Sequence, residues 1–144
     1  MKMRSVILWV SIAAFAAGSM YGQPLLFYTE GRLDEIKGMR RVVVVAPSAG
    51  ERAAVEKQLN GKHGLRIVRG GSRQFQLNYT CLPSPGSSPE EEAIVDIKVY
   101  IPDKDPIPIV WKRKESIATC NNAAARTSLV KEFLRDFGSL SRRN

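Results

Sequence analysis

The sequence predicts an α/β (α+β) domain with a mixed five-stranded sheet, in the order β-α-β-β-β-β-α, and two helices packed on that sheet. Three patterns predict it: a β-branched run followed by a helix, three segments of alternating polarity, and an amphipathic stretch near the end of the chain. The 144 residues are enough for one domain with one core. We expect a signal peptide over 1–22, a lead-in segment over 23–38, the domain over 39–140 and a basic tail over 141–144.

The first part of the domain is predicted to be a strand, a helix and a second strand. Val42–Val45 is an unbroken β-branched run, which is typical of a strand buried on both faces. Ser48 and Glu51 have the spacing of a capping box that begins a helix, and Asn60 with the glycine after it predicts its end. Leu65–Val68 is expected to be the second strand, which completes a compact βαβ unit with a right-handed crossover.

The next three predicted strands alternate apolar and polar residues with a period of two. They are Phe75–Leu82, Ala93–Ile101 and Ile107–Ile117. Such alternation indicates one packed face and one wet face, so we expect an antiparallel meander that is covered on one side only. Within the last strand, Ile109, Trp111 and Ile117 are expected to share the packed side.

A closing amphipathic helix is predicted to cover that packed side. Its apolar positions follow the spacing i, i+3, i+4, i+7, and they are Val130, Phe133, Leu134 and Phe137. Thr119, Asn121 or Asn122 can cap its first turn, and Gly138 is expected to end it.

Cys81 and Cys120 are the two cysteines of the chain. The first lies on the packed side of its predicted strand and the second just before the closing helix, so a disulfide would join helix to sheet. In an oxidising compartment an even number of cysteines favours this bond, which would stabilise the fold by about 4 kcal/mol on the loop-entropy model. The alternative is a reactive thiol that uses His63, the one histidine of the sequence, as its base.

The beginning of the chain has the layout of a secretory signal. Lys2 and Arg4 precede the apolar run Val6–Ala17, and small residues follow at 16–19. The run is shorter than the roughly 20 residues that span a bilayer. We therefore expect a mature N-terminus between Ser19 and Gln23, no stable membrane insertion after processing, and a periplasmic or extracellular location; an uncleaved signal anchor is the alternative.

The charge of the chain predicts the class of its partner. The formal net charge is +8, which becomes +6 when Lys2 and Arg4 leave with the signal. A basic exported domain attracts anionic envelope components or acidic envelope proteins. On the wet face, Lys98, Lys112 and Lys114 are expected to lie near one another, with Arg113 on the opposite side. This basic group is either a partner surface or a protection of the sheet against edge pairing.

Other residues point away from catalysis. His63 lies in a Gly-Lys-His-Gly turn, where a solvated histidine is expected, and one histidine with two oxidised cysteines makes no ordinary zinc site. The sequence has neither a Walker nor a dinucleotide glycine spacing, and it has no like-charge block of five that would indicate a nucleic-acid arm. We expect no cofactor, no metal and no nucleic acid, and a non-enzymatic recognition or assembly module of the cell envelope. The alternatives are a small secreted enzyme with a cysteine nucleophile and a binder of anionic envelope polymers.

The order of elements resembles that of small α/β modules in bacterial envelope proteins. The resemblance rests on Arg41–Val45 before a helix, Leu65–Val68 after it, Ile109–Trp111 late in the meander, and the closing helix. Such modules include the amino-terminal domain of the Tol-system propeller protein, the curli-secretion lipoprotein and the lipoproteins that activate penicillin-binding proteins. The likeness covers about residues 39–140 and implies a fold and a broad envelope role. This chain differs by having no lipidation cysteine and by having its own cysteine pair.

Overall fold

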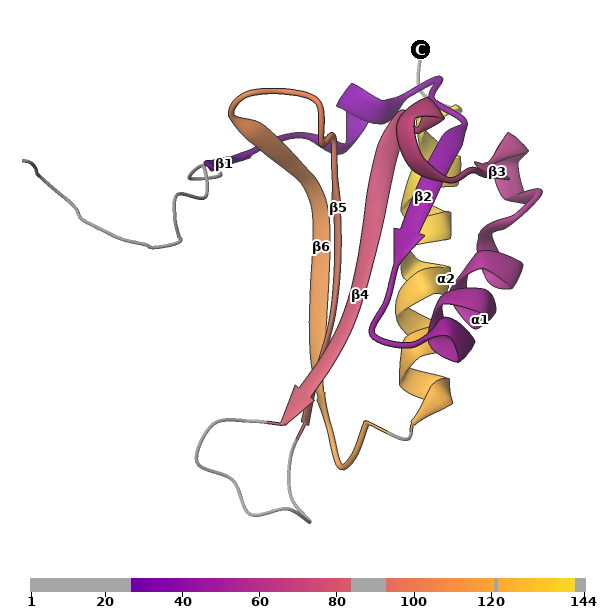
Figure 1. The fold of residues 1–144 in the computed structure, drawn as a ribbon, viewed down its shortest axis with the longest axis vertical. Helices are drawn as coiled ribbons and strands as arrows, with labels where there is room; N and C mark the ends of the chain where they lie inside the picture. Colours follow the sequence, from indigo (N-terminus) through magenta and orange to yellow (C-terminus); the bar gives the residue numbers. More distant parts are fainter. Residues whose placement is uncertain (1–26, 84–92, 121, 142–144) are drawn as a thin grey trace, which may run out of the picture.

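The computed structural model describes residues 27–83, 93–120 and 122–141. The elements in chain order are β1 (Tyr28–Glu30), β2 (Arg41–Val45), α1 (Ala49–Leu59), β3 (Arg66–Ile67), β4 (Phe75–Pro83), β5 (Ala93–Tyr100), β6 (Ile107–Ile117) and α2 (Ala123–Leu140). Short 3-10 turns lie at Leu33–Ile36, Lys62–Gly64 and Gly70–Ser72. The strands form one mixed sheet in the order β1-β6-β5-β4-β2-β3, and the predicted α+β class is confirmed (Figure 1).

Within the described residues the sheet has six strands, one more than the five predicted. β4, β5 and β6 form the predicted antiparallel meander, and β2 pairs in parallel with β3 and β4. The additional strand is β1, which lies in the predicted lead-in segment and pairs in parallel with Ile107–Ile109 of β6. At the two ends of β1, the Ile107 N–H donates a hydrogen bond to the Phe27 carbonyl (2.8 Å), and the Gly31 N–H donates one to the Ile109 carbonyl (2.9 Å). Three residues are too few to show an alternation of apolar and polar residues, so the sequence pattern gave no sign of β1.

Local chemistry explains where α1 begins and ends. The Ser48 hydroxyl accepts the Glu51 N–H (3.1 Å) and donates to the Glu51 carboxylate (2.9 Å), which caps the first turn. Gly61 has a φ of 84°, the left-handed conformation that ends many helices. Val55 and Leu59 are fully buried against the sheet. The return strand β3 is shorter than predicted, two residues instead of four.

α2 begins where the sequence predicts and ends two residues later than Gly138. The Asn122 side chain accepts the Ala125 N–H (3.2 Å) and caps the helix. Gly138 is buried inside the last turns, and the helix continues to Leu140. A Cβ atom at Gly138 would lie 2.5 Å from His63 Cε1. The glycine therefore permits close packing of the histidine ring and does not end the helix.

A β-bulge in β6 changes which of its residues share a face. Val99 pairs with Trp111, but Tyr100 pairs with Ile109, so Val110 is an extra residue on the β6 side. Val110 and Trp111 are both buried. Ile109 consequently lies on the face opposite Trp111, and the prediction that the two share the packed side is wrong.

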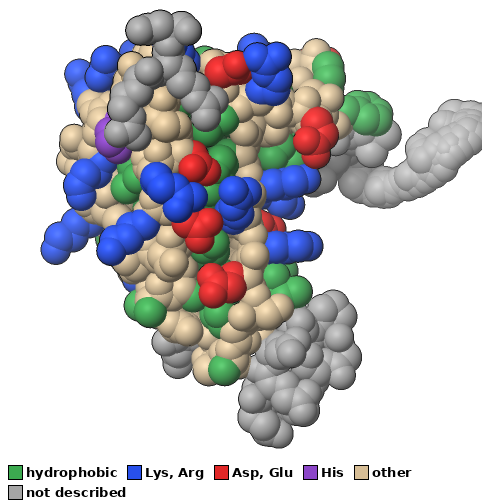
Figure 2. Space-filling view, turned by 180° about the vertical axis from the view of Figure 1, so that it is seen from behind, with side chains coloured by type: hydrophobic (Ala, Val, Ile, Leu, Met, Phe, Trp, Pro, Cys, Tyr) green, Lys and Arg blue, Asp and Glu red, His purple; other side chains and the backbone are tan. Residues whose placement is uncertain are grey.

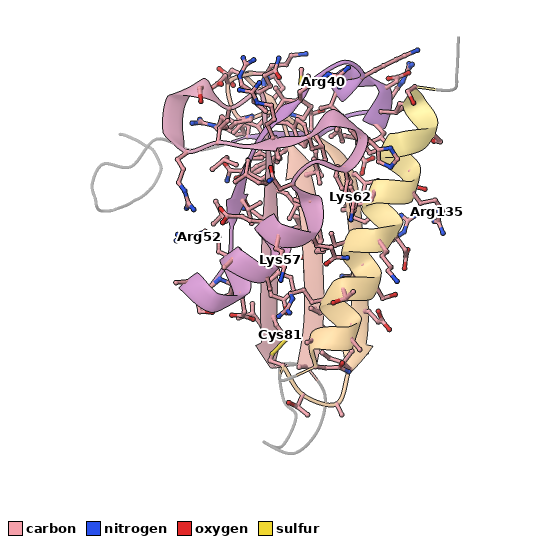
Figure 3. The ribbon with its side chains drawn as sticks, turned by 90° about the vertical axis from the view of Figure 1, so that its right-hand side faces the viewer. Arg40, Arg52, Lys57, Lys62, Cys81 and Arg135 are labelled. Carbon is pink, nitrogen blue, oxygen red and sulfur yellow. A yellow bond between two sulfur atoms is a disulfide. The ribbon has the colours of Figure 1, made fainter. Side chains whose placement is uncertain are left out.

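Both helices cover the same face of the sheet, and the core lies between them and the strands (Figure 3). An aromatic group lies at its centre: Phe133 stacks on Phe137 with centroids 5.7 Å apart and meets the Trp111 ring edge-on at 5.4 Å. The Trp111 indole N–H donates to the Asp136 carboxylate (2.9 Å), so the edge of α2 is fixed to β6 by a hydrogen bond to a charged group. The opposite face of the sheet has no helix on it among the described residues.

Candidate functional site

The face of the sheet opposite the helices, here called the open face, is the broadest surface that the fold leaves uncovered by the described elements. Strand pairing assigns its members, because directly paired residues point to the same side of a sheet. They include Val43 and Val45 of β2; Gln76, Asn78, Thr80 and Leu82 of β4; Ile94, Asp96, Lys98 and Tyr100 of β5; Ile107, Ile109, Lys112, Lys114 and Ser116 of β6; Tyr28 and Glu30 of β1.

The three predicted lysines, here called the basic strip, lie together on the open face. Lys98 and Lys112 are directly opposite each other in the β5–β6 pairing, and Lys114 is opposite Asp96. All three lysine side chains are exposed. Two ammonium groups directly opposite each other are unfavourable unless carboxylates lie close by. The Lys112 Nζ is 3.3 Å from the Glu30 carboxylate and the Lys98 Nζ is 3.7 Å from Asp96.

A surface hollow of about 440 Å³ lies at the basic strip, lined by Asp96, Lys98, Lys112, Arg113 and Lys114. Arg113 comes from the helix side of β6, where its guanidinium lies 5.4 Å from the centre of the Trp111 ring and 3.4 Å from the Glu132 carboxylate. The Arg113 guanidinium also donates to the Lys112 carbonyl (3.2 Å), so it lies close to the β6 backbone. The residues that line the hollow are thus four cations and one carboxylate.

One face of the molecule carries more positive than negative side chains. Figure 2 shows Lys and Arg side chains gathered over the middle of one face, with fewer Asp and Glu side chains between them. Such a surface concentrates anionic partners near it and speeds their encounter, and salt weakens this effect.

A polar network occupies the other half of the open face. The side-chain amides of Gln76 (2.5 Å) and Asn78 (3.0 Å) both donate to the Tyr100 hydroxyl, whose ring meets Tyr28 edge-on at 6.1 Å. Burial raises the pKa of the Tyr100 hydroxyl above its ordinary value of 10.0. The phenol is neutral at physiological pH, and these contacts connect β4 to β5 and, across β6, β5 to β1 beside the basic strip.

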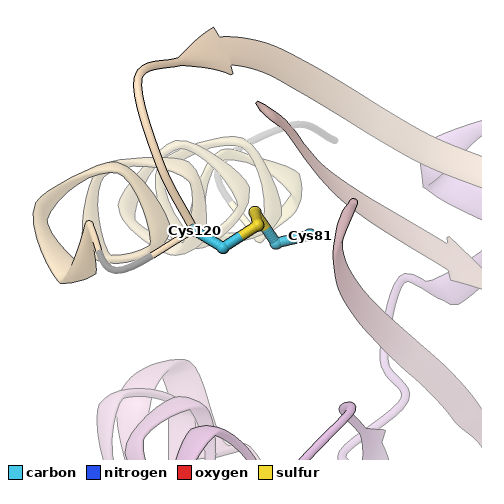
Figure 4. Close-up of a disulfide and its surroundings, with 2 residues drawn as sticks. All are labelled: Cys81 and Cys120. Carbon is cyan, nitrogen blue, oxygen red and sulfur yellow. A yellow bond between two sulfur atoms is a disulfide. The ribbon is translucent and has the colours of Figure 1, made fainter. Parts of the chain in front are cut away.

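The two cysteines are joined in a disulfide (Figure 4), and Cys81 pairs with the buried Val95, on the face of the sheet opposite the basic strip. Their Cα atoms are 5.8 Å apart, and the bond connects β4 to the segment just before α2. The helix-to-sheet connection predicted from the sequence is therefore present. While the bond is intact neither sulfur is available as a nucleophile or metal ligand.

His63 is exposed, as predicted, but its ring also packs on α2. It meets Phe137 edge-on at 6.4 Å and lies against Gly138. A second hollow, of about 520 Å³, lies here, lined by Lys37, Gly38, Met39, Arg40, His63, Phe137, Leu140 and Ser141. Its cations surround the C-terminal end of α2, where the helix dipole is negative, so they stabilise the helix end.

The cysteine–histidine pair of the enzymatic alternative is not assembled. Cys120 precedes the first turn of α2, whereas His63 contacts its last turns. A helix of 18 residues is about 27 Å long, which separates the two side chains well beyond hydrogen-bond distance. Within the described ranges no group of three His, Cys, Asp or Glu side chains could hold a metal ion.

Sequence reasoning missed two contributors to the hollow and its surroundings. Glu30 reaches the basic strip because β1 joins the sheet, and a three-residue strand has no sequence signal. Arg113 was assigned correctly to the opposite side, but only the structure shows that it also lines the hollow.

Comparisons with known proteins give structural likeness only. No protein-family model matches the sequence, and no curated protein matches it. The PelC dodecamer from Paraburkholderia phytofirmans has 14% identity and a TM-score of 0.39, over 75% of this chain and 91% of that chain. A minor lipoprotein from Acinetobacter baumannii has 13% identity and a TM-score of 0.36, over 70% and 92%. Lipoprotein GNA1162 from Neisseria meningitidis has 9% identity and a TM-score of 0.33, over 67% and 96%. The resemblance to the three envelope families stays a prediction.

No helix in the described part of the chain is both long enough and apolar enough to cross a membrane.

Proposed function

We propose that this protein is an exported, non-enzymatic recognition module of a bacterial-type cell envelope, and that it binds an acidic partner protein through the basic strip. The observation that carries the proposal is the placement of Lys98, Lys112 and Lys114 together on the open face, at a hollow lined by four cations and one carboxylate. The open face gives these side chains a broad sheet surface on which a partner can dock.

The pattern of charge favours a protein over a polyanion. Glu30 lies within 4 Å of Lys112 and Asp96 within 4 Å of Lys98, so negative groups are interspersed among the positive ones. A polymer with uniformly spaced phosphates is repelled at these two positions. A folded acidic partner can place its carboxylates beside the lysines and avoid Glu30 and Asp96, which is how charge complementarity gives specificity.

Export supports an envelope location. The charged start, the short apolar run and the small residues at 16–19 lie outside the described residues and are known from the sequence alone. A disulfide is typical of a protein that works in an oxidising compartment, and Cys81 and Cys120 form one. We infer a periplasmic or extracellular location.

Absence of catalysis is part of the proposal. The sulfurs of Cys81 and Cys120 are bonded to each other, and His63 lies at the other end of α2. These two facts weigh against the cysteine-nucleophile alternative.

Retention on native envelope fractions tests the proposal. Replacing Lys98, Lys112 and Lys114 by Gln should abolish most retention, and added salt should weaken retention of the unchanged protein. The unfolding temperature should change little, because isolated surface charges contribute at most about 1 kcal/mol each. The matched control replaces the exposed Lys57, Lys62 and Lys131 by Gln, which removes the same charge from other parts of the surface. Figure 3 labels Lys57 on α1 and Lys62 in the turn that follows it.

Retention unaffected by salt, or equal loss in both triple variants, would contradict recognition by the basic strip. Equal binding of the unchanged protein to vesicles of anionic phospholipid would indicate the polymer or lipid alternative in place of an acidic protein.

A further inference from the structure

β6 has a backbone edge that the described strands cover only in part. β1 pairs with Ile107–Ile109 and then leaves the sheet at Gly31. From Lys112 to Ile117, the strand neighbour among the described residues is β5 alone. Residues 112–116 are all exposed, although successive side chains point to opposite faces. On the helix side Arg113 contacts α2 through Glu132 and Asp136, whereas the backbone edge of this segment has no described strand beside it except β5.

The phase of the strand shows which backbone groups point outward at that edge. Ile107 N–H and Ile109 C=O bond to the β1 side, and both side chains lie on the open face. Along a strand, the edge to which a residue's N–H and C=O point and the face to which its side chain points change together from one residue to the next. At the bulge, Val110 and Trp111 are both buried on the same side, so this relation between edge and face still holds after it. Lys112 and Lys114 are on the open face, so their N–H and C=O groups point to the outer edge of β6, here called the free edge, as do those of Ser116. The Arg113 guanidinium donates to the Lys112 C=O (3.2 Å), so that carbonyl already has one partner.

Charge selects the occupant of this edge. Exposed strand edges are templates for pairing with another chain, and lysines on an edge disfavour pairing between identical copies. If β6 of a second copy paired here in antiparallel fashion about a two-fold axis at Lys114, the two Lys114 residues would lie opposite each other. With the axis at Arg113, Lys112 of each copy would lie opposite Lys114 of the other. An extended segment with carboxylates on its open-face side would place them beside Lys112 and Lys114 instead.

We propose that an extended acidic segment of the partner adds a strand to the Lys112–Ser116 edge of β6, beside the basic strip. This inference rests on the proposed function and names its mode of binding. Main-chain hydrogen bonds to Lys112, Lys114 and Ser116 supply affinity, and the lysine side chains select the acidic segment, as in other cases of strand addition. The sheet already takes one strand at this edge, since β1 occupies its first three positions.

Amide hydrogen exchange of the full exported chain, measured by NMR, tests the pairing residue by residue. The probe is a short synthetic peptide in which Glu and Thr alternate, because Thr favours strands and Glu supplies the charge. In the free protein, the amides of Arg113 and Glu115, which face β5, should be protected, and those of Lys112, Lys114 and Ser116 should exchange fast. Saturating peptide should slow exchange of the second group by about tenfold or more. Two control peptides, one with Lys in place of Glu and one with alternate backbone nitrogens methylated, should leave the exchange of these amides unchanged.

A pair of variants at Ser116 separates backbone pairing from charge. Ser116→Pro removes an outward N–H without altering a charge, and an edge position tolerates proline. Ser116→Ala keeps the N–H and serves as control. We expect similar unfolding temperatures, unchanged peptide binding for the alanine variant and clearly weaker binding for the proline variant.

The outcomes distinguish the two proposals. Peptide binding without slower exchange at Lys112, Lys114 and Ser116 would overturn strand addition and leave recognition by side chains standing. Slower exchange with the peptide, but salt-insensitive retention on envelope fractions, would contradict the proposed function and support the edge as a strand acceptor.

Protection in the free protein that rises with its concentration would identify a second copy as the occupant and overturn the proposal. If Ser116→Pro does not fold, the exchange measurement alone decides.

Discussion

The contact between His63 and Gly138 shows how single residues adjust the packing of α2. The imidazole lies where a side chain at position 138 would otherwise be, with its Cε1 2.5 Å from the place of a Cβ atom. His63 has a φ of 50°, in the left-handed region that non-glycine residues rarely adopt. The turn between Gly61 and Gly64 thus brings the ring onto the helix, and the missing side chain of Gly138 makes room for it.

This contact predicts a strong coupling between the two positions. In an otherwise unchanged chain, Gly138→Ala should give little or no stabilisation, because the gain in helix propensity is offset by collision with the ring. In a His63→Ala background, the same change should stabilise the fold by about 1 kcal/mol. Urea unfolding of the four proteins gives the interaction energy, and strain at position 63 cancels in the cycle. Equal stabilisation in both backgrounds would show that the ring does not restrict position 138.

The sequence could not distinguish the two uses of this glycine. A glycine after an amphipathic run ends many helices, and a glycine within a helix permits close approach of another group. Both leave the same local pattern. The apolar stripe was predictable because its positions repeat, and Val130, Phe133, Leu134 and Phe137 are all buried.

At the scale of elements, the disulfide connects the two parts of the fold that carry the core. Cys81 belongs to β4, a central strand, and Cys120 to the segment that leads into α2. The bond restricts the unfolded chain and fixes the start of the helix over the sheet. Its pairing was predictable because the chain has two cysteines and a predicted export signal.

Removing this bond should lower stability substantially. Cys120→Ser should reduce the free energy of unfolding by about 2–5 kcal/mol. Chemical unfolding with and without reductant measures the effect, and reductant should destabilise the unchanged protein but not the variant. Alkylation adds a second readout, since both cysteines should resist modification until the folded protein is reduced. Two freely alkylated thiols in the untreated protein would contradict the bond and restore the thiol alternative.

Elements that rely on pairing instead of periodicity were predicted least well. β1 has three residues, is held by backbone contacts with β6 and was missed, and β3 was predicted but has two residues instead of four. The bulge at Val110 is likewise a property of the β5–β6 pair, and Ile109 changed face because of it. Long alternating segments predict strands well, since burial of one face imposes the period.

At the scale of the whole molecule, the sheet has helices on one face and the basic strip, among polar and apolar side chains, on the other. The alternation of the meander predicted a face without cover, and it also predicted that Lys98, Lys112 and Lys114 would share it. The hollow at the basic strip could not be predicted, because it depends on where β1 ends and how far α2 reaches. The basic strip, the free edge and the open face meet at this place.

Zero-length coupling of amines to carboxylates in native envelopes, followed by mass spectrometry, tests recognition by the basic strip most directly. Coupling of Lys112 to Glu30, whose groups are 3.3 Å apart, shows that the reagent reaches the strip. The account predicts additional links from Lys98, Lys112 and Lys114 to acidic residues of one partner protein. Links to partners that arise mainly from Lys57, Lys62 and Lys131, with the strip coupled only to its own carboxylates, would contradict it.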